Sequence, residues 1–257
     1  MAYLKQIFDF KYLIWILASR DIKTQYSQTR YGLILAFLKA IISAILFQLF
    51  FGYVLKVDVP IMPYIVYVFP GLMLWYYFSH IVSFASVSLI QSQVLIQKVF
   101  FPKIILLFSK SIVGLVDLFI WLIIYVIILF YYNVTVRFTI LLLPISILFT
   151  MINGLAISIW LSSLTIKNRD AVHIIPFIIG FGIFVTPVFF SFNALPEQYQ
   201  FIQYFNPMSG AIMFFRWCVF GIDFSWMHFL GQLISVFIFV PGLIYFKKIE
   251  GVISDVI

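Results

Sequence analysis

The stretch that decides the fold class is Ile104–Tyr131, which reads IILLFSKSIVGLVDLFIWLIIYVIILFY. A transmembrane helix needs about 20 mostly apolar residues to cross the hydrocarbon core of a bilayer. This stretch is longer than that and carries only two charged residues, Lys110 and Asp117. Lipid offers no partner for an unpaired backbone group, so the stretch is predicted to be a helix. A membrane β-barrel would instead show short segments of alternating hydrophobicity.

Five further apolar stretches take up most of the remaining chain. They cover residues 33–55, 64–90, 138–162, 173–192 and 229–246. The chain is 64% hydrophobic and 10% charged, whereas a soluble domain is about 25% charged. The sequence therefore predicts an all-α membrane protein with six transmembrane helices and no room for a second, soluble domain.

The positive charges sort to one side of this arrangement. The side with both termini carries Lys5, Lys11, Arg20, Lys23, Arg30, Lys98, Lys103, Lys110, Lys167, Arg169, Lys247 and Lys248. The opposite side carries Lys56, Arg137 and Arg216. The positive-inside rule places both termini in the cytoplasm, and an even number of helices requires the termini to share a side. The net charge of +7 therefore belongs to membrane loops and does not indicate a nucleic-acid partner.

The N-terminal segment is predicted to be an amphipathic helix at the membrane interface. Its residues Leu4, Phe8, Tyr12 and Trp15 recur at helical spacing, which is typical of such a helix. A cleaved signal peptide is disfavoured, because acidic and basic residues flank the apolar run and no clean small-residue cleavage site follows it.

The connection of residues 91–103 is predicted to hold a short amphipathic helix. Pro102 disfavours helical geometry at Phe101, so this helix ends before the third membrane helix begins. Its apolar side chains would face a membrane surface or a partner protein.

The connection of residues 193–228 is too apolar for an ordinary loop. Two apolar runs in it, residues 201–205 and 211–220, are too short to span, and Pro196 and Pro207 interrupt the region. Such runs are typical of re-entrant segments, and irregular backbone at membrane depth survives where it lines a cavity or is buried in protein. The prediction is a re-entrant region that dips into the outer leaflet and shapes an exit, with a loop lying flat on the bilayer as the alternative.

The sequence lacks the common catalytic and metal-binding motifs. It contains no phosphate-binding loop, no HExxH and no G-x-S-x-G. Its histidines, His80, His173 and His228, are scattered, and Cys218 is its single cysteine. We therefore expect a chain that is not an enzyme and holds neither a metal nor a cofactor of its own.

Asp117, Lys39 and Arg216 each fall within an apolar stretch, where charge is costly and often functional. Asp117 could relay protons, or it could be a buried carboxyl bonded to a neighbouring helix. Lys39 could extend its stem to the interface, or contact an anionic headgroup. Arg216 could hold a lipid phosphate, or pair with Glu197 or Asp223.

Aromatic residues form one further pattern. Phe177, Phe181 and Phe184 share one face of the fifth predicted helix, because residues three and four apart are neighbours on a helix. Sugars pack their C–H faces on aromatic rings, so this face could line a path for a glycan. Ordinary helix packing explains the same spacing.

An ordered set of short strings carries a resemblance to a known family. The set includes Arg20-Asp21-Ile22-Lys23, Phe50-Phe51-Gly52, Phe69-Pro70-Gly71-Leu72, Gln97-Lys98-Val99-Phe100-Phe101-Pro102-Lys103, Arg169-Asp170, Thr186-Pro187-Val188, Asn206-Pro207-Met208 and Asp255-Val256-Ile257. Over nearly its whole length the chain resembles ABC-2-type permeases that export lipid-linked polysaccharides such as O-antigen, capsule or teichoic acid. It departs from them at Leu38-Lys39-Ala40, where family members carry something like Leu-Gln-Pro. The first helix is therefore expected to lack a proline kink, and no role for Lys39 follows from the family.

The resemblance implies half of a transporter. Two copies would pair as a homodimer in the cell (inner) membrane, and each would dock a separate cytoplasmic ABC ATPase that binds ATP and Mg²⁺. The chain would be one transmembrane domain, residues 1–257. It would consist of an interface segment (1–32), a six-helix membrane region (33–246) and a cytoplasmic tail (247–257).

The resemblance also assigns sites. The element that couples to the ATPase would match residues 93–103, with Gln93, Ile96, Lys98, Phe100, Phe101, Pro102 and Lys103 as its candidates. The channel would be lined mainly by the first and fifth helices, with Phe177, Phe181 and Phe184 facing the glycan. The re-entrant helices of the exit would match residues 193–221, including Pro196, Pro207 and Arg216.

The candidates for the cytoplasmic entrance are Arg20, Asp21, Lys23, Arg30 and Lys39. The basic members of this set would attract the diphosphate headgroup of the substrate, since a basic residue near an anionic surface contributes about 1 kcal/mol.

The leading hypothesis is an ATP-driven exporter of undecaprenyl-linked polysaccharide. One alternative is an ABC-2 exporter of drugs or lipids, and another is a proton-driven flippase that uses Asp117. An integral-membrane glycosyltransferase is disfavoured, because no long polar loop is available for a sugar nucleotide. The sequence leaves open which glycan is moved and which type of envelope the host has.

Overall fold

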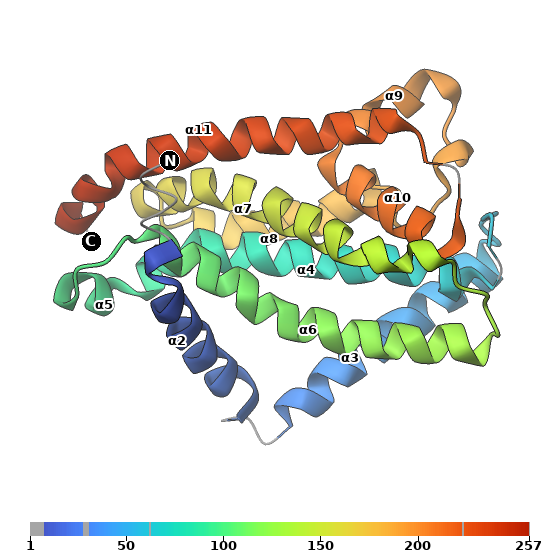
Figure 1. The fold of residues 1–257 in the computed structure, drawn as a ribbon, viewed down its shortest axis with the longest axis horizontal. Coiled ribbons are helices and arrows are strands. Elements are labelled where there is room, and N and C mark those ends of the chain that lie inside the picture. The colour runs from blue at the N-terminus through green and yellow to red at the C-terminus, as the bar shows by residue number, and fades with distance from the viewer. Residues whose placement is uncertain (1–7, 28–30, 62, 223, 257) are drawn as a thin grey trace.

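The structure is a computed structural model that describes residues 8–27, 31–61, 63–222 and 224–256. These residues form helices joined by short connections, and no strand occurs among them. The long helices run roughly along the longest axis of the molecule (Figure 1). The prediction of an all-α protein is confirmed.

The described residues of the first half of the chain include five labelled α-helices. They are α2 (Lys11–Ile22), α3 (Gly32–Phe47), α4 (Tyr64–Gln91), α5 (Gln93–Lys98) and α6 (Ile104–Tyr131). Two π-helical segments, η1 (Lys23–Ser27) and η2 (Gln48–Val54), follow α2 and α3. The second half contains α7 (Leu143–Lys167), α8 (Ala171–Val185), α9 (Glu197–Phe205), α10 (Pro207–Phe220) and α11 (Phe229–Val256). Short 3₁₀ turns, η3 (Phe138–Leu142), η4 (Phe192–Ala194) and η5 (Trp226–His228), precede α7, α9 and α11.

Among the described residues, five helical segments are long and apolar enough to cross a membrane. They are Gly32–Val54, Tyr64–Gln91, Ile104–Tyr131, Phe138–Lys167 and Trp226–Gly251. Each coincides with one of the predicted transmembrane stretches.

The predicted fifth span, residues 173–192, is shorter than expected. Its helix α8 has 15 residues, which at 1.5 Å per residue is about 22 Å, less than the roughly 30 Å of a hydrocarbon core. It ends at Val185 because Thr186 is extended, with φ −97° and ψ 143°. Thr186 precedes Pro187, and the residue before a proline is biased away from helical geometry.

Helix α4 forms the centre of the bundle. In the most apolar part of α4, 78% of the residues are buried within the chain, whereas the corresponding share for Gly32–Val54 is 17%. Gly154 of α7 lets the backbones approach closely, because a Cβ at this position would lie 2.9 Å from the Cβ of Ile81 on α4. Hydroxyl groups join the same two helices, as where Thr165 donates to the carbonyl of Ser86 at 2.7 Å. Small residues and interhelical hydrogen bonds are typical of helix packing in membranes.

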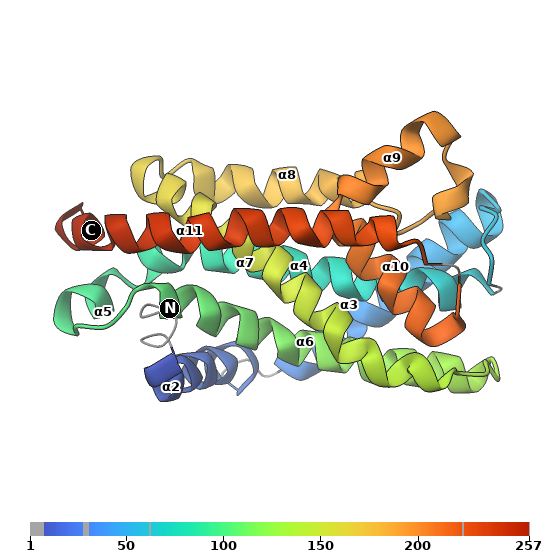
Figure 2. The same cartoon turned by 45° about the horizontal axis from the view of Figure 1, so that its top comes forward.

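The N-terminal helix lies at an angle across α6 (Figures 1 and 2). Ile14 and Leu17 of α2 are buried, whereas Phe8, Tyr12 and Trp15 are exposed. These three form the predicted apolar face; its fourth member, Leu4, lies outside the described residues. The aromatic side chains are thus exposed on α2, and the position of this helix at a membrane interface stays a prediction.

The two ends of the bundle differ. The α5 loop and the C-terminal end of α11 lie at one end, and α9 and α10 at the other (Figure 1). Helix α11 runs without a break to Val256. The segment 247–257, predicted to be a cytoplasmic tail, is therefore helical as far as it is described, and its place in the cytoplasm stays a prediction.

Candidate functional site

Helix α5 and the turn after it project from one end of the bundle (Figure 2). Phe100 is 95% exposed, and Lys98 is exposed as well. The helix is a single short segment, Gln93–Lys98, and ends where Val99 is extended. This tip presents a large apolar ring and an ammonium group that the rest of the described chain does not cover.

The base of the same loop is fixed to the bundle. Ile96, Phe101 and Lys103 are buried, and so is Pro102. The backbone N–H of Lys103 donates a hydrogen bond to the carboxylate of Glu250 on α11. The predicted coupling residues therefore divide into an exposed tip, Lys98 and Phe100, and a buried base, with Gln93 half-buried between them.

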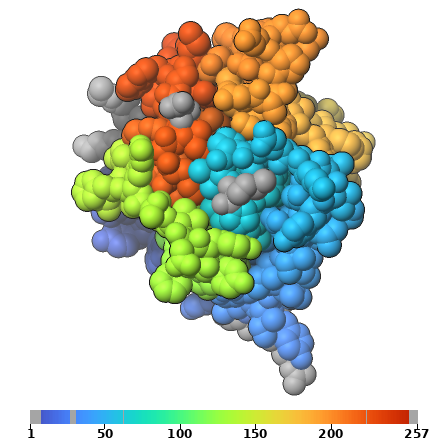
Figure 3. All heavy atoms as spheres, turned by 90° about the vertical axis from the view of Figure 1, so that its right-hand side faces the viewer, coloured from blue at the N-terminus to red at the C-terminus, as the bar shows by residue number. Residues whose placement is uncertain are grey.

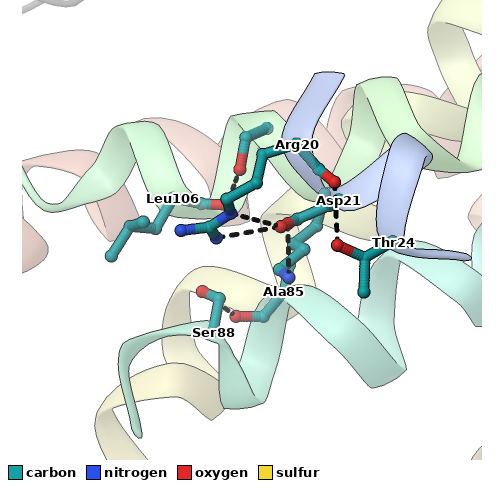
Figure 4. Close-up of polar contacts among 8 residues, drawn as sticks. Arg20, Asp21, Thr24, Ala85, Ser88 and Leu106 are labelled. Atoms are coloured by element: carbon teal, nitrogen blue, oxygen red, sulfur yellow. Dashed lines mark hydrogen bonds and ion pairs between the residues drawn. The ribbon is translucent and has the colours of Figure 1, made fainter. Parts of the chain in front are cut away.

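An ion-pair cluster joins α2 to α6 at this end. The carboxylate of Asp21 accepts hydrogen bonds from Lys110 Nζ at 2.8 Å and from Arg20 Nη2 at 2.9 Å. The hydroxyl of Thr24 donates to the carbonyl of Arg20 at 3.0 Å (Figure 4). Burial alone would raise the pKa of Asp21, but the hydrogen bonds and positive charges of Lys110 and Arg20 outweigh it and hold the pKa below its ordinary value.

The predicted entrance residues do not form one cluster. The side chain of Arg20 is 54% exposed and Lys23 is exposed, so both can meet an anion from outside. Asp21 is occupied by Lys110, a partner that sequence reasoning did not assign. Arg30 lies outside the described residues, and Lys39 lies in a separate cavity.

That cavity, about 200 Å³ in volume, lies between α3, α4 and α6. Lys39 Nζ sits 4.9 Å from the centre of the Tyr76 ring, and His80 Nδ1 is 3.9 Å from a carboxylate oxygen of Asp117. The other carboxylate oxygen of Asp117 accepts a hydrogen bond from the Tyr26 hydroxyl at 2.6 Å. Asp117 is therefore a carboxyl bonded to a neighbouring hydroxyl, which was one of the two sequence interpretations. Sequence reasoning missed Tyr26 and His80, and nothing in the spacing could have paired residues so far apart in the chain.

The aromatic face of α8 is uncovered. Phe177, Phe181 and Phe184 are 67%, 58% and 61% exposed, while Ile175, Ile179 and Ile183 on the opposite face are buried. Helix α3 is similarly uncovered. Phe189, in the segment after α8, bridges the two helices near the α9–α10 end, because its ring stacks on Phe47 of α3 at 4.7 Å and contacts Phe184 of α8 at 5.6 Å. Apart from the contact of Phe184 with Phe189, the three phenylalanines thus share a largely exposed face.

The connection between α8 and α11 folds into two short helices, α9 and α10. Pro196 and Pro207 stand at their starts, as N-cap and first helical residue respectively. The side chain of Asn206 caps α10 by accepting hydrogen bonds from the backbone N–H of Met208 and Ser209, which satisfies two donors that a helix start leaves free.

Arg216 of α10 is completely buried. Its guanidinium donates to the carbonyls of Tyr67, Pro187 and Val188 at 3.3, 2.8 and 2.9 Å, and to the Tyr67 hydroxyl at 3.0 Å. It also lies 3.8 Å from the centre of the Tyr67 ring. The side chain thus joins α10 to α4 and to the segment after α8.

Neither sequence interpretation of Arg216 describes these contacts. The guanidinium has no exposed surface with which to meet a lipid phosphate, and Glu197 is exposed elsewhere on α9. Asp223, the other suggested partner, lies outside the described residues. Sequence reasoning missed the actual acceptors because backbone carbonyls have no signature in the sequence.

Comparison with known proteins identifies the family. The family described as ABC-2 type transporter matches residues 12–220, most of the chain. The chain belongs to this ABC-2 type transporter family. It is thus a multi-pass inner membrane protein, and the match includes most of α2 and all of the α5 loop, α8 and α10.

Relatives of this ABC-2 chain are export permeases. Two proteins named O-antigen export system permease protein RfbA from Klebsiella pneumoniae are 21% and 22% identical to it, and each alignment covers 95% of both chains. A protein of the same name from Myxococcus xanthus is 23% identical over 76% of this chain and 74% of its own length. The resemblance seen in the sequence is confirmed.

Proposed function

We propose that this chain is the membrane subunit of an ATP-driven exporter of lipid-linked polysaccharide, with an undecaprenyl carrier. The observation that carries the proposal is the likeness to O-antigen export permeases along 95% of both chains. The chain itself contains no phosphate-binding loop, so ATP and Mg²⁺ are assigned to a separate ATPase subunit.

The tip of the α5 loop is the proposed ATPase contact. A partner that covered Phe100 would remove from water a side chain that is 95% exposed, and an aromatic anchor of this kind is typical of interface hot spots. The buried base of the loop, through Lys103 and Glu250, would pass movement of the tip into the bundle. The distribution of basic residues places this end in the cytoplasm.

A homodimer is the proposed channel. The faces of α3 and α8 that this chain leaves uncovered would meet their counterparts across a two-fold axis, as is usual for homo-oligomers. Helix α8 would complete a sixth crossing together with the extended residues after it, and α9 and α10 would form the re-entrant exit. Phe177, Phe181 and Phe184 would then face the glycan.

The proposed entrance lies beside α2 on the cytoplasmic side. Arg20 and Lys23 present positive charge there, next to the exposed aromatic face of α2. A lipid-linked substrate carries both a diphosphate and an apolar chain, and this surface offers a partner for each.

The test targets the loop tip in a full complex. Lys98→Ala and Phe100→Ala are expected to reduce co-purification of the proposed ABC ATPase subunit by more than tenfold, and surface glycan with it. Phe130→Ala is the matched control, because Phe130 is 85% exposed at the other end of α6. Unchanged co-purification and export in both tip variants would exclude the loop as the coupler. Glycan transport by the permease without any ATPase would exclude the ATP-driven mechanism.

A further inference from the structure

A groove lies at the α9–α10 end of the bundle, away from the α5 loop. One cavity of about 390 Å³ is lined by residues that include Phe192, Tyr204, Ser225 and His228. A second, of about 280 Å³, includes Asp58. The two cavities share Pro60, Ser191 and Asn193, so we treat them as one groove and call it the outer groove. Figure 3 looks onto this end, where the segment around residue 60 (cyan) meets the orange segment that contains α9 and α10.

His228 supplies an unsatisfied acceptor to this groove. Its Nδ1 lies 3.0 Å from the carbonyl oxygen of Ser225. A carbonyl can only accept, so Nδ1 carries the proton and Nε2 of the neutral ring is left with a lone pair. Nε2 is buried and has no hydrogen-bond partner among the described residues. A buried polar atom without a partner is destabilising, so a shift of the ring that brought Nε2 to the groove surface would let a ligand O–H satisfy it.

Aromatic rings surround the same position. The ring of His228 lies 5.0 Å from Phe192 and 4.9 Å from Tyr204, and Phe192 and Tyr204 are 5.1 Å apart. The face of an aromatic ring is negative and attracts weakly positive hydrogens. The C–H hydrogens on one side of a pyranose ring match this surface.

The rim of the outer groove is polar and mostly neutral. Ser191, Asn193 and Ser225 offer hydroxyl and amide groups, and Asp58 offers the one carboxylate among the described lining residues. No lysine or arginine occurs among those residues, although the guanidinium of Arg137 lies against Gly221 of the lining. The polar atoms of the groove are unsuited to an acyl chain, which would leave them without partners.

We propose that the outer groove binds a sugar residue of the exported glycan at the exit side of the permease. Hydroxyl-rich, uncharged pyranoses combine C–H faces with several O–H donors, and the groove combines ring faces with several acceptors. Its size falls within the 300–1,000 Å³ typical of small-molecule sites. This inference rests on the proposed export of a polysaccharide, and it adds a binding site to the aromatic channel face.

The test measures sugar binding to the purified, full-length permease in lipid nanodiscs by saturation-transfer NMR. The probes are free glucose, galactose, mannose, rhamnose and N-acetylglucosamine. At least one is expected to give a transfer signal that falls fivefold or more in Asn193→Ala and in His228→Phe. His228→Phe replaces the imidazole with another aromatic ring that cannot accept a hydrogen bond. Asn193→Ala tests the site with little effect on packing, because Asn193 is exposed.

Gln198→Ala is the control, because Gln198 is an exposed polar residue of α9 that does not line the groove. It is expected to retain the full signal. The proposal is overturned if no probe gives a signal, or if the signal is the same in Asn193→Ala as in the wild type. The measurement needs no ATPase, so the two proposals fail separately. Absence of binding in a permease that exports glycan rejects only the groove, while binding in a permease that exports none rejects only the exporter.

Discussion

Lys110 Nζ donates a hydrogen bond to the carboxylate of Asp21 at 2.8 Å, and this pair is the ionic link between α2 and α6. The two side chains are only 14% and 17% exposed. A pair that is this shielded from water contributes more than an exposed surface pair. It holds the N-terminal helix against the bundle at the end where the substrate is proposed to enter.

The first prediction concerns the pH dependence of this link. The pKa of Asp21 is lower in the folded protein than its ordinary value of 3.8, so the stabilisation is fully present above about pH 4 and is lost as the pH falls through the folded value. Asp21→Asn is expected to lower stability at pH 7 by about 1.5–3 kcal/mol, the range for a hydrogen bond to a charged group. Thermal unfolding in detergent, measured from pH 7 downward, should show the two proteins converging below pH 4.

The control for this measurement is Asp9→Asn, since Asp9 is exposed near the start of α2. Its unfolding midpoint should follow that of the wild type at every pH. A difference between Asp21→Asn and the wild type that persists undiminished below pH 3 would contradict the assignment.

The second prediction concerns the contact between α4 and α7. A methyl group at Gly154 would lie 2.9 Å from two carbons of Ile81, so Gly154→Ala must push the helices apart. We expect a loss of about 1–3 kcal/mol, as for other overpacked sites. Gly180→Ala on α8 meets nothing within 4 Å and should be neutral or slightly stabilising. Equal unfolding midpoints for the two variants would refute the close approach.

The third prediction concerns Arg216. Arg216→Met keeps an apolar stem but leaves the carbonyls of Pro187 and Val188 without their donor, and an unsatisfied buried group costs about 1–3 kcal/mol. The segment after α8 should loosen, and limited chymotrypsin digestion should cut near Phe189 and Phe190. Arg137→Met removes an exposed arginine and should leave the digestion pattern unchanged.

The fourth prediction separates ATP-driven from proton-driven export. Asn at position 117 can still accept the Tyr26 hydroxyl bond but cannot take up a proton as a carboxylate does. Under the ATP-driven mechanism, Asp117→Asn should keep surface glycan within about twofold of the wild type, because a hydrogen bond of about 1 kcal/mol is preserved. Tyr26→Phe, which removes that bond, should have the larger effect of the two. Loss of export in Asp117→Asn alone would favour the proton-driven alternative.

Much of the fold follows from patterns within the sequence. Apolar length predicts Ile104–Tyr131 and the four other spanning segments, because lipid imposes one simple requirement on each. The shortening of α8 was also visible in principle, since Thr186 precedes a proline. The extension of α11 through the charged residues after Phe246 could not be predicted from the sequence, because a helix can continue beyond the membrane where neighbouring segments pack against it.

The site was less accessible to sequence reasoning. The exposed aromatic face of α8 follows from helical spacing, and the tip and base of the α5 loop fall within the predicted coupling element. The partners of Asp117 and Arg216 do not follow, because they depend on which distant backbone and hydroxyl groups the packing brings near. The outer groove assembles three separate connections, so no single stretch of sequence indicates it.

The hydrogen bond between Lys103 and Glu250 connects α11 to the base of the α5 loop. This helix has 28 residues, or about 42 Å at 1.5 Å per residue, and it reaches from the base of the α5 loop to the neighbourhood of α10. Pro241 removes one backbone hydrogen bond within it, which makes that turn its most compliant point. A displacement of the loop base would therefore move the Glu250 end of α11 first and would bend the helix near Pro241.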